Sequence, residues 1–266
     1  MKDKKLFFAV FFIFLFLNLS FLSAKPQSLR DYFTEITLPR LDYSIVKVYP
    51  HDPSSFTQGL VVEGNILYES TGLYGESSVR SIDLLTGKVL RKAALSEEYF
   101  AEGITMWGNQ LVQLTWKSKV IFFYDKSSLA KLRTLPYPYE GWGITFDGKH
   151  FITSDGSSLL RFFRPPDFTE ERVIEVRAAG RSISSLNELE YAKGKIYANV
   201  WHEDVIVVID PQSGEVVGWI DGSLLGDPHR KREDVLNGIA YDAEDQTFLI
   251  TGKRWSSLYR LRLNGW

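Results

Sequence analysis

The sequence of 266 residues contains no cysteine. The folded protein therefore has no disulfide, no thiol nucleophile and no thiolate ligand for a metal ion. It also lacks an excess of either charge, because 31 Lys and Arg residues are opposed by 33 Asp and Glu residues. No Lys and Arg cluster follows a helical pattern, so nothing in the sequence points to a nucleic acid or to an anionic membrane as a partner.

Several common catalytic signatures are missing as well. The sequence has no Gly-x-Ser-x-Gly elbow, no phosphate-binding loop and no dinucleotide fingerprint. Its four histidines, His51, His150, His202 and His229, do not have the spacing of zinc ligands. Aromatic residues, in contrast, make up 14% of the chain, which suits a sheet-rich core or a stacking site.

The N-terminus resembles a secretory signal. Lysines at positions 2, 4 and 5 precede an apolar run over residues 6–16, and Ser23-Ala24 supplies small residues for cleavage. We predict that residues 1–24 are a signal peptide and that the protein is exported, to the periplasm or into the medium. An uncleaved membrane anchor is the alternative, because the apolar stretch approaches the length that spans a bilayer. Without that anchor, the mature domain is not expected to bind a membrane.

A short phrase recurs five times along the rest of the chain. Its copies are Phe56-Thr57-Gln58-Gly59-Leu60, Phe100-Ala101-Glu102-Gly103-Ile104, Gly141-Trp142-Gly143-Ile144, Leu186-Asn187-Glu188-Leu189 and Leu236-Asn237-Gly238-Ile239. The residue in the variable position of the phrase advances by 44, 40, 45 and 50 residues. A period of this size, built from short strands, is typical of a β-propeller with one phrase per blade.

The strand pattern agrees with that interpretation. From residue 43 onward, β-rich runs alternate with turns such as Glu-Gly-Asn at 63–65 and Asp-Pro-Gln-Ser-Gly at 210–214. We predict an all-β fold over residues 43–266, a five-bladed β-propeller. Residues 25–42, which are mixed and flanked by proline, are predicted to be a linker.

The two ends of the domain suggest how the ring closes. The fifth copy leaves too little chain for another strand after Leu263, whereas the run Tyr43–Tyr49 precedes the first copy and belongs to no blade. We expect this N-terminal strand to join the last blade and close the ring, which would leave no open sheet edge.

The variable position of the phrase predicts where chemistry occurs. Because the inner strands of a propeller line its axis, five side chains should meet at one mouth of the channel: Gln58, Glu102, Trp142, Asn187 and Asn237. The ends of the next strands add Trp116, Trp201 and Lys253. Glycines in the phrase are explained by crowding at the axis. Tryptophans and a lysine are not, because burial alone favours aliphatic side chains there.

Several longer phrases resemble the plant and bacterial glutaminyl-peptide cyclotransferases. They are Phe-Thr-Gln-Gly-Leu (56–60), Tyr-Glu-Ser-Thr-Gly-Leu-Tyr-Gly (68–75), Glu-Gly-Trp-Gly (140–143), Leu-Asn-Glu-Leu-Glu-Tyr (186–191), Ala-Asn-Val-Trp (198–201) and Asp-Val-Leu-Asn-Gly-Ile-Ala-Tyr-Asp (234–242). The resemblance runs from about residue 44 to the C-terminus. It implies a five-bladed propeller that converts an N-terminal glutamine to pyroglutamate and releases ammonia, without a metal or other cofactor. The partner it implies is a peptide or protein with N-terminal glutamine, and we expect a monomer.

The resemblance also implies that nine residues form the pocket, and the chemistry of cyclisation suggests their roles. The expected catalytic residues are Glu102 as proton shuttle, Asn187, which fixes the amine or amide together with Gln58, and Lys253, which (or an indole N–H) stabilises the oxyanion. The expected substrate-binding residues are Phe56, Gln58, Phe100, Trp116, Trp142 and Trp201. One departure from the family pattern is Arg254-Trp255-Ser256, where a Leu-Trp-Pro run is common, and Arg254 could add charge near the mouth. Asn237 receives no role beyond the ring.

Other interpretations follow from the same residues. A ring of Glu102, Asn187 and Asn237 is rich in oxygen, as in a calcium-dependent propeller hydrolase of the lactonase type. Trp142 in the same ring and the presence of one charged member argue against it, and loss of activity on chelation would favour it. A propeller that only binds proteins would not need Glu102. Taken alone, Glu102 could be a structural carboxylate, Lys253 a solvated side chain, and Phe56 and Phe100 core residues.

Overall fold

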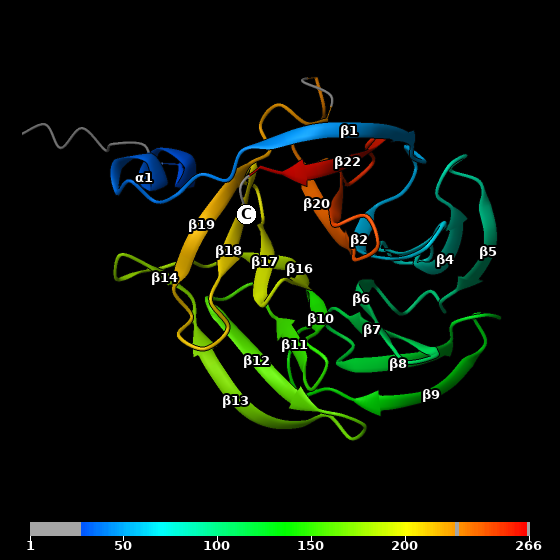
Figure 1. The fold of residues 1–266 in the computed structure, drawn as a ribbon. Helices are drawn as coiled ribbons and strands as arrows, with labels where there is room; N and C mark the ends of the chain where they lie inside the picture. The colour runs from blue at the N-terminus through cyan, green and yellow to red at the C-terminus, as the bar shows by residue number, and fades with distance from the viewer. Residues whose placement is uncertain (1–27, 227–228, 265–266) are drawn as a thin grey trace, which may run out of the picture.

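The computed structural model describes residues 28–226 and 229–264. Within them, five antiparallel sheets of four strands each stand around a common axis (Figure 1). The predicted five-bladed β-propeller is therefore confirmed. The signal peptide predicted over residues 1–24 lies outside the described residues.

Each blade is a meander whose first strand lies nearest the axis and whose fourth strand forms the rim (Figure 1). The first blade contains β2 (Thr57–Glu63), β3 (Ile66–Thr71), β4 (Ser78–Asp83) and β5 (Val89–Ala94). The second contains β6 (Ala101–Trp107), β7 (Gln110–Thr115), β8 (Val120–Asp125) and β9 (Lys131–Pro136). The third contains β10 (Ile144–Phe146), β11 (Phe151–Ser154), β12 (Leu159–Arg164) and β13 (Thr169–Glu175). The fourth contains β16 (Leu186–Ala192), β17 (Lys195–Val200), β18 (Val205–Ile209) and β19 (Val216–Asp221), after a small hairpin of β14 (Arg177–Ala178) and β15 (Arg181–Ser182).

The fifth blade closes the ring as predicted. It contains β20 (Leu236–Asp242), β21 (Thr247–Gly252) and β22 (Ser257–Leu263) from the C-terminal part of the chain. Its rim strand is β1 (Tyr43–Pro50), which pairs with β22 from Tyr43 opposite Leu263 to Pro50 opposite Ser257. The two ends of the propeller are thus held together by a ladder of backbone hydrogen bonds rather than by a covalent link.

The segment before β1 differs from the predicted linker. Residues Leu29–Glu35 form helix α1, whose first turn is capped by the Ser28 hydroxyl accepting a hydrogen bond from the Asp31 amide at 3.2 Å. Leu29 and Phe33 lie four residues apart and share one helical face, which packs on the fourth blade. The ring centroids of Phe33 and Trp219 are 5.8 Å apart. The helix is therefore part of the folded unit and lies outside β19 (Figure 1).

The glycines of the repeated phrase allow the inner strands to touch. A Cβ atom on Gly59 would lie 2.6 Å from the Ile104 amide nitrogen, and one on Gly103 would lie 2.8 Å from the Ile144 amide nitrogen. A Cβ atom on Gly143 would overlap the backbone carbonyl oxygen of Asn187. Since real Cβ contacts do not occur at such distances, glycine is required where the blades converge.

The fourth copy of the phrase has Glu188 in place of glycine, and its carboxyl group lies among the inner strands. One oxygen accepts a hydrogen bond from the Leu60 amide at 3.2 Å, and the other accepts one from the Ile239 amide at 2.8 Å. Glu188 is fully buried and thereby joins the first, fourth and fifth blades. Two backbone donors that the ladders leave free are satisfied by this one side chain.

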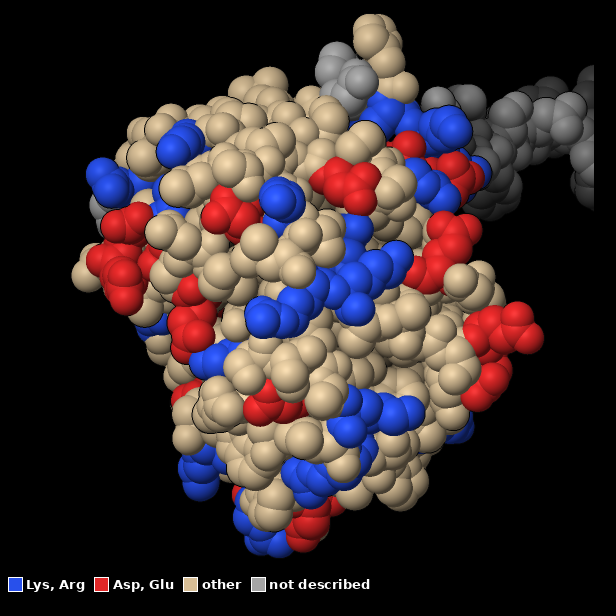
Figure 2. All heavy atoms as spheres, turned by 90° about the vertical axis from the view of Figure 1, so that its right-hand side faces the viewer, with Lys and Arg blue, Asp and Glu red and all other residues tan. Residues whose placement is uncertain are grey.

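The rim of the molecule has a mixed surface. Figure 2 views the side of the first two blades, where Lys and Arg side chains are interspersed with Asp and Glu side chains. The rim strands β5 and β9 carry the basic residues Arg91, Lys92, Lys131 and Arg133. Among the residues that the structure describes, no helix has the length and apolar character required to cross a bilayer.

Candidate active site

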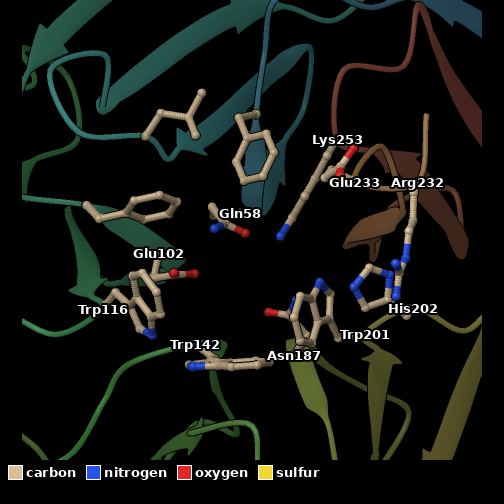
Figure 3. Close-up of a pocket in the computed structure, with 13 residues that line it drawn as sticks. Gln58, Glu102, Trp116, Trp142, Asn187, Trp201, His202, Arg232, Glu233 and Lys253 are labelled. Carbon is tan, nitrogen blue, oxygen red and sulfur yellow. The ribbon is translucent and has the colours of Figure 1, made fainter. Parts of the chain in front are cut away.

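A cavity of about 460 Å³ opens at one end of the propeller axis. Its size falls in the range of sites for small molecules or side chains. All nine residues implied by the sequence resemblance line it: Phe56, Gln58, Phe100, Glu102, Trp116, Trp142, Asn187, Trp201 and Lys253. Figure 3 shows the polar groups of Gln58, Glu102, Asn187 and Lys253 pointing toward a common space from different blades.

The inner strands carry the polar base of the cavity. Gln58, Glu102 and Asn187 lie near the starts of β2, β6 and β16. In each case the pairing register with the next strand shifts at this place, so the residue has no direct partner across the ladder. Such bulges re-aim side chains. In these three copies the repeated phrase is therefore a local irregularity that aims its variable side chain at the cavity.

Aromatic rings form the walls. Phe100 contacts Phe56 and Trp116 with centroid separations of 6.2 and 5.6 Å, and Trp142 meets Trp201 at 5.6 Å with nearly perpendicular planes. These edge-to-face arrangements are favourable for aromatic pairs. Trp116 is also fixed by its indole N–H, which donates to the Glu140 carboxylate at 2.9 Å.

A carboxyl group and an amine are buried together in the cavity. Glu102 and Lys253 are each 5% exposed. Burial raises the pKa of Glu102 well above its usual range; the Lys253 charge opposes this rise and Glu140 adds to it. Burial likewise lowers the pKa of Lys253 to about 8, against the attraction of Glu102. Both groups are thus brought toward the range in which proton transfer at neutral pH is easy.

Two residues that line the cavity each have a buried polar atom without a partner. They are the indole Nε1 of Trp142 and the side-chain oxygen Oδ1 of Asn187, and neither has a hydrogen-bond partner in the described part of the structure. A buried donor and a buried acceptor left unsatisfied carry a cost in free energy. A polar ligand that reached them would remove this cost.

Asn237, the fifth member of the ring, does not line the cavity. Its amide nitrogen donates to the backbone oxygen of Thr57 at 2.9 Å and lies 3.4 Å from Oε1 of Gln58. The expectation that all five ring members point into one mouth is therefore wrong for this residue. Asn237 instead supports the strand that carries Gln58, because the seam between the first and last blades runs there.

Four other residues border the cavity that the repeat did not single out as site residues: Leu73, His202, Arg232 and Glu233. His202 directly follows Trp201, which the sequence placed at the mouth, and its ring centroid lies 4.2 Å from that of Trp201. Arg232 and Glu233 belong to the connection between β19 and β20, which has no counterpart in the repeat. Arg254 lies behind the wall, over the Phe56 ring at 4.9 Å, and pairs with Asp234 at 3.2 Å.

In the parts of the chain that are described, no group of three or more His, Asp or Glu side chains is arranged to hold a metal ion. Among the nine predicted residues, the polar groups are one carboxyl, one amine and neutral amide and indole groups, and Arg232, Glu233 and His202 add a guanidinium, a second carboxyl and an imidazole to the lining. Such a set can bind an amine or an amide and can move a proton between them.

Fold and cavity together define a propeller enzyme with a buried acid–base pair inside an aromatic enclosure. A sequence model of the family described as "Glutamine cyclotransferase" matches residues 14–263. The chain belongs to the glutamine cyclotransferase family, which confirms the resemblance seen in the sequence.

Two relatives show the extent of the similarity. A glutaminyl-peptide cyclotransferase of Arabidopsis thaliana is 43% identical over 229 residues, which are 84% of this chain and 71% of the relative. The crystal structure of Myxococcus xanthus glutaminyl cyclase is similar with a TM-score of 0.78 and 34% identity, covering 85% of this chain and 98% of that one.

Proposed function

We propose that this protein is a glutaminyl-peptide cyclotransferase that needs no metal ion. It acts outside the cytoplasm, as a monomer, on peptides or proteins with N-terminal glutamine. The observation that carries the proposal is the buried pair of Glu102 and Lys253, which shares a cavity with an unpartnered donor on Trp142 and an unpartnered acceptor on Asn187. Family membership and the two relatives support the substrate class.

The reaction is intramolecular. The neutral α-amine attacks the carbonyl carbon of the γ-carboxamide, a C–N bond closes the five-membered ring, and the bond to the amide nitrogen breaks. One proton leaves the attacking nitrogen and one joins the departing nitrogen, which leaves as ammonia. The main tasks of the site are to hold the near-attack geometry and to move this proton.

Glu102 is the group that moves the proton. The reference pKa of an α-amine is about 8, so an ordinary carboxylate is too weak a base to take its proton readily. Burial raises the pKa of Glu102 well above its usual range, which makes its carboxylate a stronger base. The same proton can then be delivered to the leaving nitrogen, because a carboxyl group with a raised pKa remains protonated until it meets the amide.

The other polar groups orient the substrate and stabilise the tetrahedral intermediate. Oδ1 of Asn187 accepts an N–H of the substrate amine, and Nε1 of Trp142 donates to a substrate oxygen; both atoms have no partner in the described structure. The Lys253 ammonium stabilises the negative oxygen of the tetrahedral intermediate. Gln58, held from behind by Asn237, binds the carboxamide.

The aromatic walls determine the outcome of the reaction. Phe56, Phe100, Trp116, Trp142 and Trp201 surround the methylene groups of the glutamine side chain. They exclude water, which would otherwise attack the same carbon and yield glutamate instead of pyroglutamate.

The test is incubation of the purified protein with a glutaminyl dipeptide. We expect ammonia release and a mass loss equal to one ammonia molecule, which distinguishes cyclisation from hydrolysis. An N-acetylated glutaminyl dipeptide, which lacks the free amine, and an asparaginyl dipeptide, which would have to form a smaller ring, should not react. Glu102→Gln should lower kcat by about 10²- to 10⁴-fold. Absence of turnover on every glutaminyl peptide would refute the proposal.

A parallel incubation with a chelator tests the alternative that the protein is a calcium-dependent hydrolase. Unchanged turnover after chelation and dialysis supports the metal-independent reaction. Lost activity that added Ca²⁺ restores would instead support a calcium site built on Glu102, Asn187 and Asn237.

A further inference from the structure

A buried ionic network lies behind the cavity, at the seam where the ring closes. His51 follows β1, Glu69 lies on β3 and Arg80 lies on β4. Their side chains are 2%, 0% and 6% exposed. None of the three lines the cavity. Buried charges of this kind are often no more stabilising than well-packed apolar residues, so stability alone does not explain the network.

His51 is held as an imidazolium. Its Nδ1 lies 2.6 Å from the backbone oxygen of Trp255, and its Nε2 lies 3.0 Å from Oε1 of Glu69. Both neighbours are acceptors, and only the doubly protonated ring can donate from both nitrogens. Burial, the largest single influence, and the charge of Arg80 favour the neutral ring, but the charge of Glu69 together with the hydrogen bonds to Glu69 and Trp255 outweighs them, and the pKa of His51 is raised.

The network joins two segments that carry site residues. On the first-blade side, the Thr57 hydroxyl donates to Oε1 of Glu69 at 2.7 Å, and Thr57 stands between Phe56 and Gln58. Arg80 supports the same carboxylate and also pairs with Asp52 at 2.8 Å. The carboxylate of Glu69 therefore anchors the strand that enters the cavity from the first blade.

On the last-blade side, His51 binds the backbone of Trp255, two residues after Lys253. The amide of Arg254 adds a second link by donating to the backbone oxygen of Ser55 at 2.7 Å. The chain from Thr57 through Glu69 and His51 to Trp255 thus connects segments nearly 200 residues apart in the sequence.

We propose that His51 and Glu69 are positioning residues for cyclisation, which set Lys253 relative to Phe56 and Gln58 across the seam. The inference rests on the proposed function. Nζ of Lys253 lies 4.7 Å from the centroid of the Phe56 ring, and no hydrogen bond within the described residues fixes it there. Its place depends on its backbone, and a displacement of about 1 Å can cost on the order of 100-fold in rate.

Two substitutions separate the two links of His51. The amide nitrogen of Asn can take the place of Nδ1, and that of Gln the place of Nε2. His51→Gln keeps a donor for Glu69 and loses the link to Trp255, whereas His51→Asn keeps the donor for Trp255 and loses the link to Glu69. Either change interrupts the chain between Thr57 and Trp255, so we expect kcat of both variants to fall on the order of 10- to 100-fold with little change in KM. A kcat within about 3-fold of the parent in either variant would overturn the proposal.

A matched control comes from another buried pair. In the last blade, Arg260 binds Asp242 at 2.9 Å, and both side chains are less than 9% exposed. Asp242→Asn should lower the melting temperature, as the His51 variants do, but should leave kcat unchanged because neither residue borders the cavity. A loss of kcat in this control that matches the loss in His51→Gln would show a general effect of stability and would overturn the proposal.

Two further measurements apply if the His51 variants do not fold or the parent does not turn over. Thr57→Val removes the hydroxyl bound to Glu69 at nearly constant volume; an unchanged kcat/KM would contradict the proposal.

Without turnover, which would refute the proposed function itself, the pH dependence of Lys253 acetylation can be followed by peptide mass spectrometry. Its midpoint, near 8 in the parent, should move in Thr57→Val or His51→Gln and not in Asp242→Asn. An unmoved midpoint would overturn the positioning role.

Discussion

The ammonium nitrogen of Lys253 lies 4.7 Å from the centroid of the Phe56 ring. The face of the ring attracts a cation, while burial disfavours the charge and lowers the pKa of Lys253 to about 8. That charge in turn holds the pKa of Glu102 below the value that burial alone would produce. The protonation of the two groups is thus linked, and this linkage can be measured.

Replacement of Lys253 by methionine should shift the pH dependence of the reaction. Without the ammonium, the pKa of Glu102 rises further, so the acidic limb of kcat should move to higher pH and kcat should fall by about 10²- to 10³-fold. Lys253→Arg keeps a positive charge that does not titrate in this pH range. Its pH profile of kcat should therefore keep the acidic limb of the parent and lose any basic limb that comes from deprotonation of the lysine. Steady-state kinetics across the pH range test this, and an acidic limb at the parent's pH in Lys253→Met would contradict the linkage.

The same substitution should stabilise the fold at neutral pH. The pKa of Lys253 falls from 10.5 to about 8 on folding, so at pH 7 the protonated lysine opposes folding by about 3 kcal/mol. Stability of the parent should rise as the pH increases from about 8 to 10.5, because over that window the unfolded chain still holds the proton. Urea denaturation should show Lys253→Met more stable than the parent at pH 7, with the difference in the free energy of unfolding shrinking from about pH 8 to 10.5. A less stable variant at pH 7 would refute this assignment.

Contact between the third and fourth blades should not tolerate a methyl group. In Gly143→Ala the new Cβ overlaps the backbone oxygen of Asn187, which is itself held by the Ser154 hydroxyl at 2.6 Å. We expect a loss of more than about 3 kcal/mol in the free energy of unfolding and a displaced Asn187. Gly108→Asn is the control, because Gly108 has a left-handed φ of 58° and open space around it, and asparagine accepts that conformation. Similar urea midpoints for the two variants would argue against the close approach.

Helix α1 should contribute to stability and not to catalysis. Phe33 is fully buried against the fourth blade, far along the chain from any residue that lines the cavity. Phe33→Ala should lower the free energy of unfolding by about 3–5 kcal/mol. At temperatures below the unfolding transition, kcat and KM should be unchanged. Unfolding curves and kinetics on the same preparation decide this. An unchanged unfolding midpoint would mean that the segment is the linker that its sequence suggests.

The architecture was accessible from the sequence because the phrase at 56–60 and its four later copies mark the same place in every blade. The unassigned run at Tyr43–Tyr49 likewise indicated its partner strand, since a ring must close. Helix α1 escaped prediction because one buried pair, Leu29 and Phe33, in a short polar segment gives too little periodicity.

The site was predictable where it follows the repeat and unpredictable where it does not. Glu102 and Asn187 occupy repeat positions, whereas Arg232 and Glu233 lie in the connection between β19 and β20, which is longer than the other connections between blades. The role of Glu188 was hidden for a different reason. Its carboxylate bonds to amides 128 and 51 residues away, and no local pattern reports contacts of that length.

The side chain of Glu188 also connects the cavity to the ring of inner strands. Asn187 lines the cavity, and the next residue, Glu188, bonds to the first and last blades. A change at the seam between these blades is therefore expected to reach Asn187 through its neighbour in the chain, even where the changed side chain does not line the cavity.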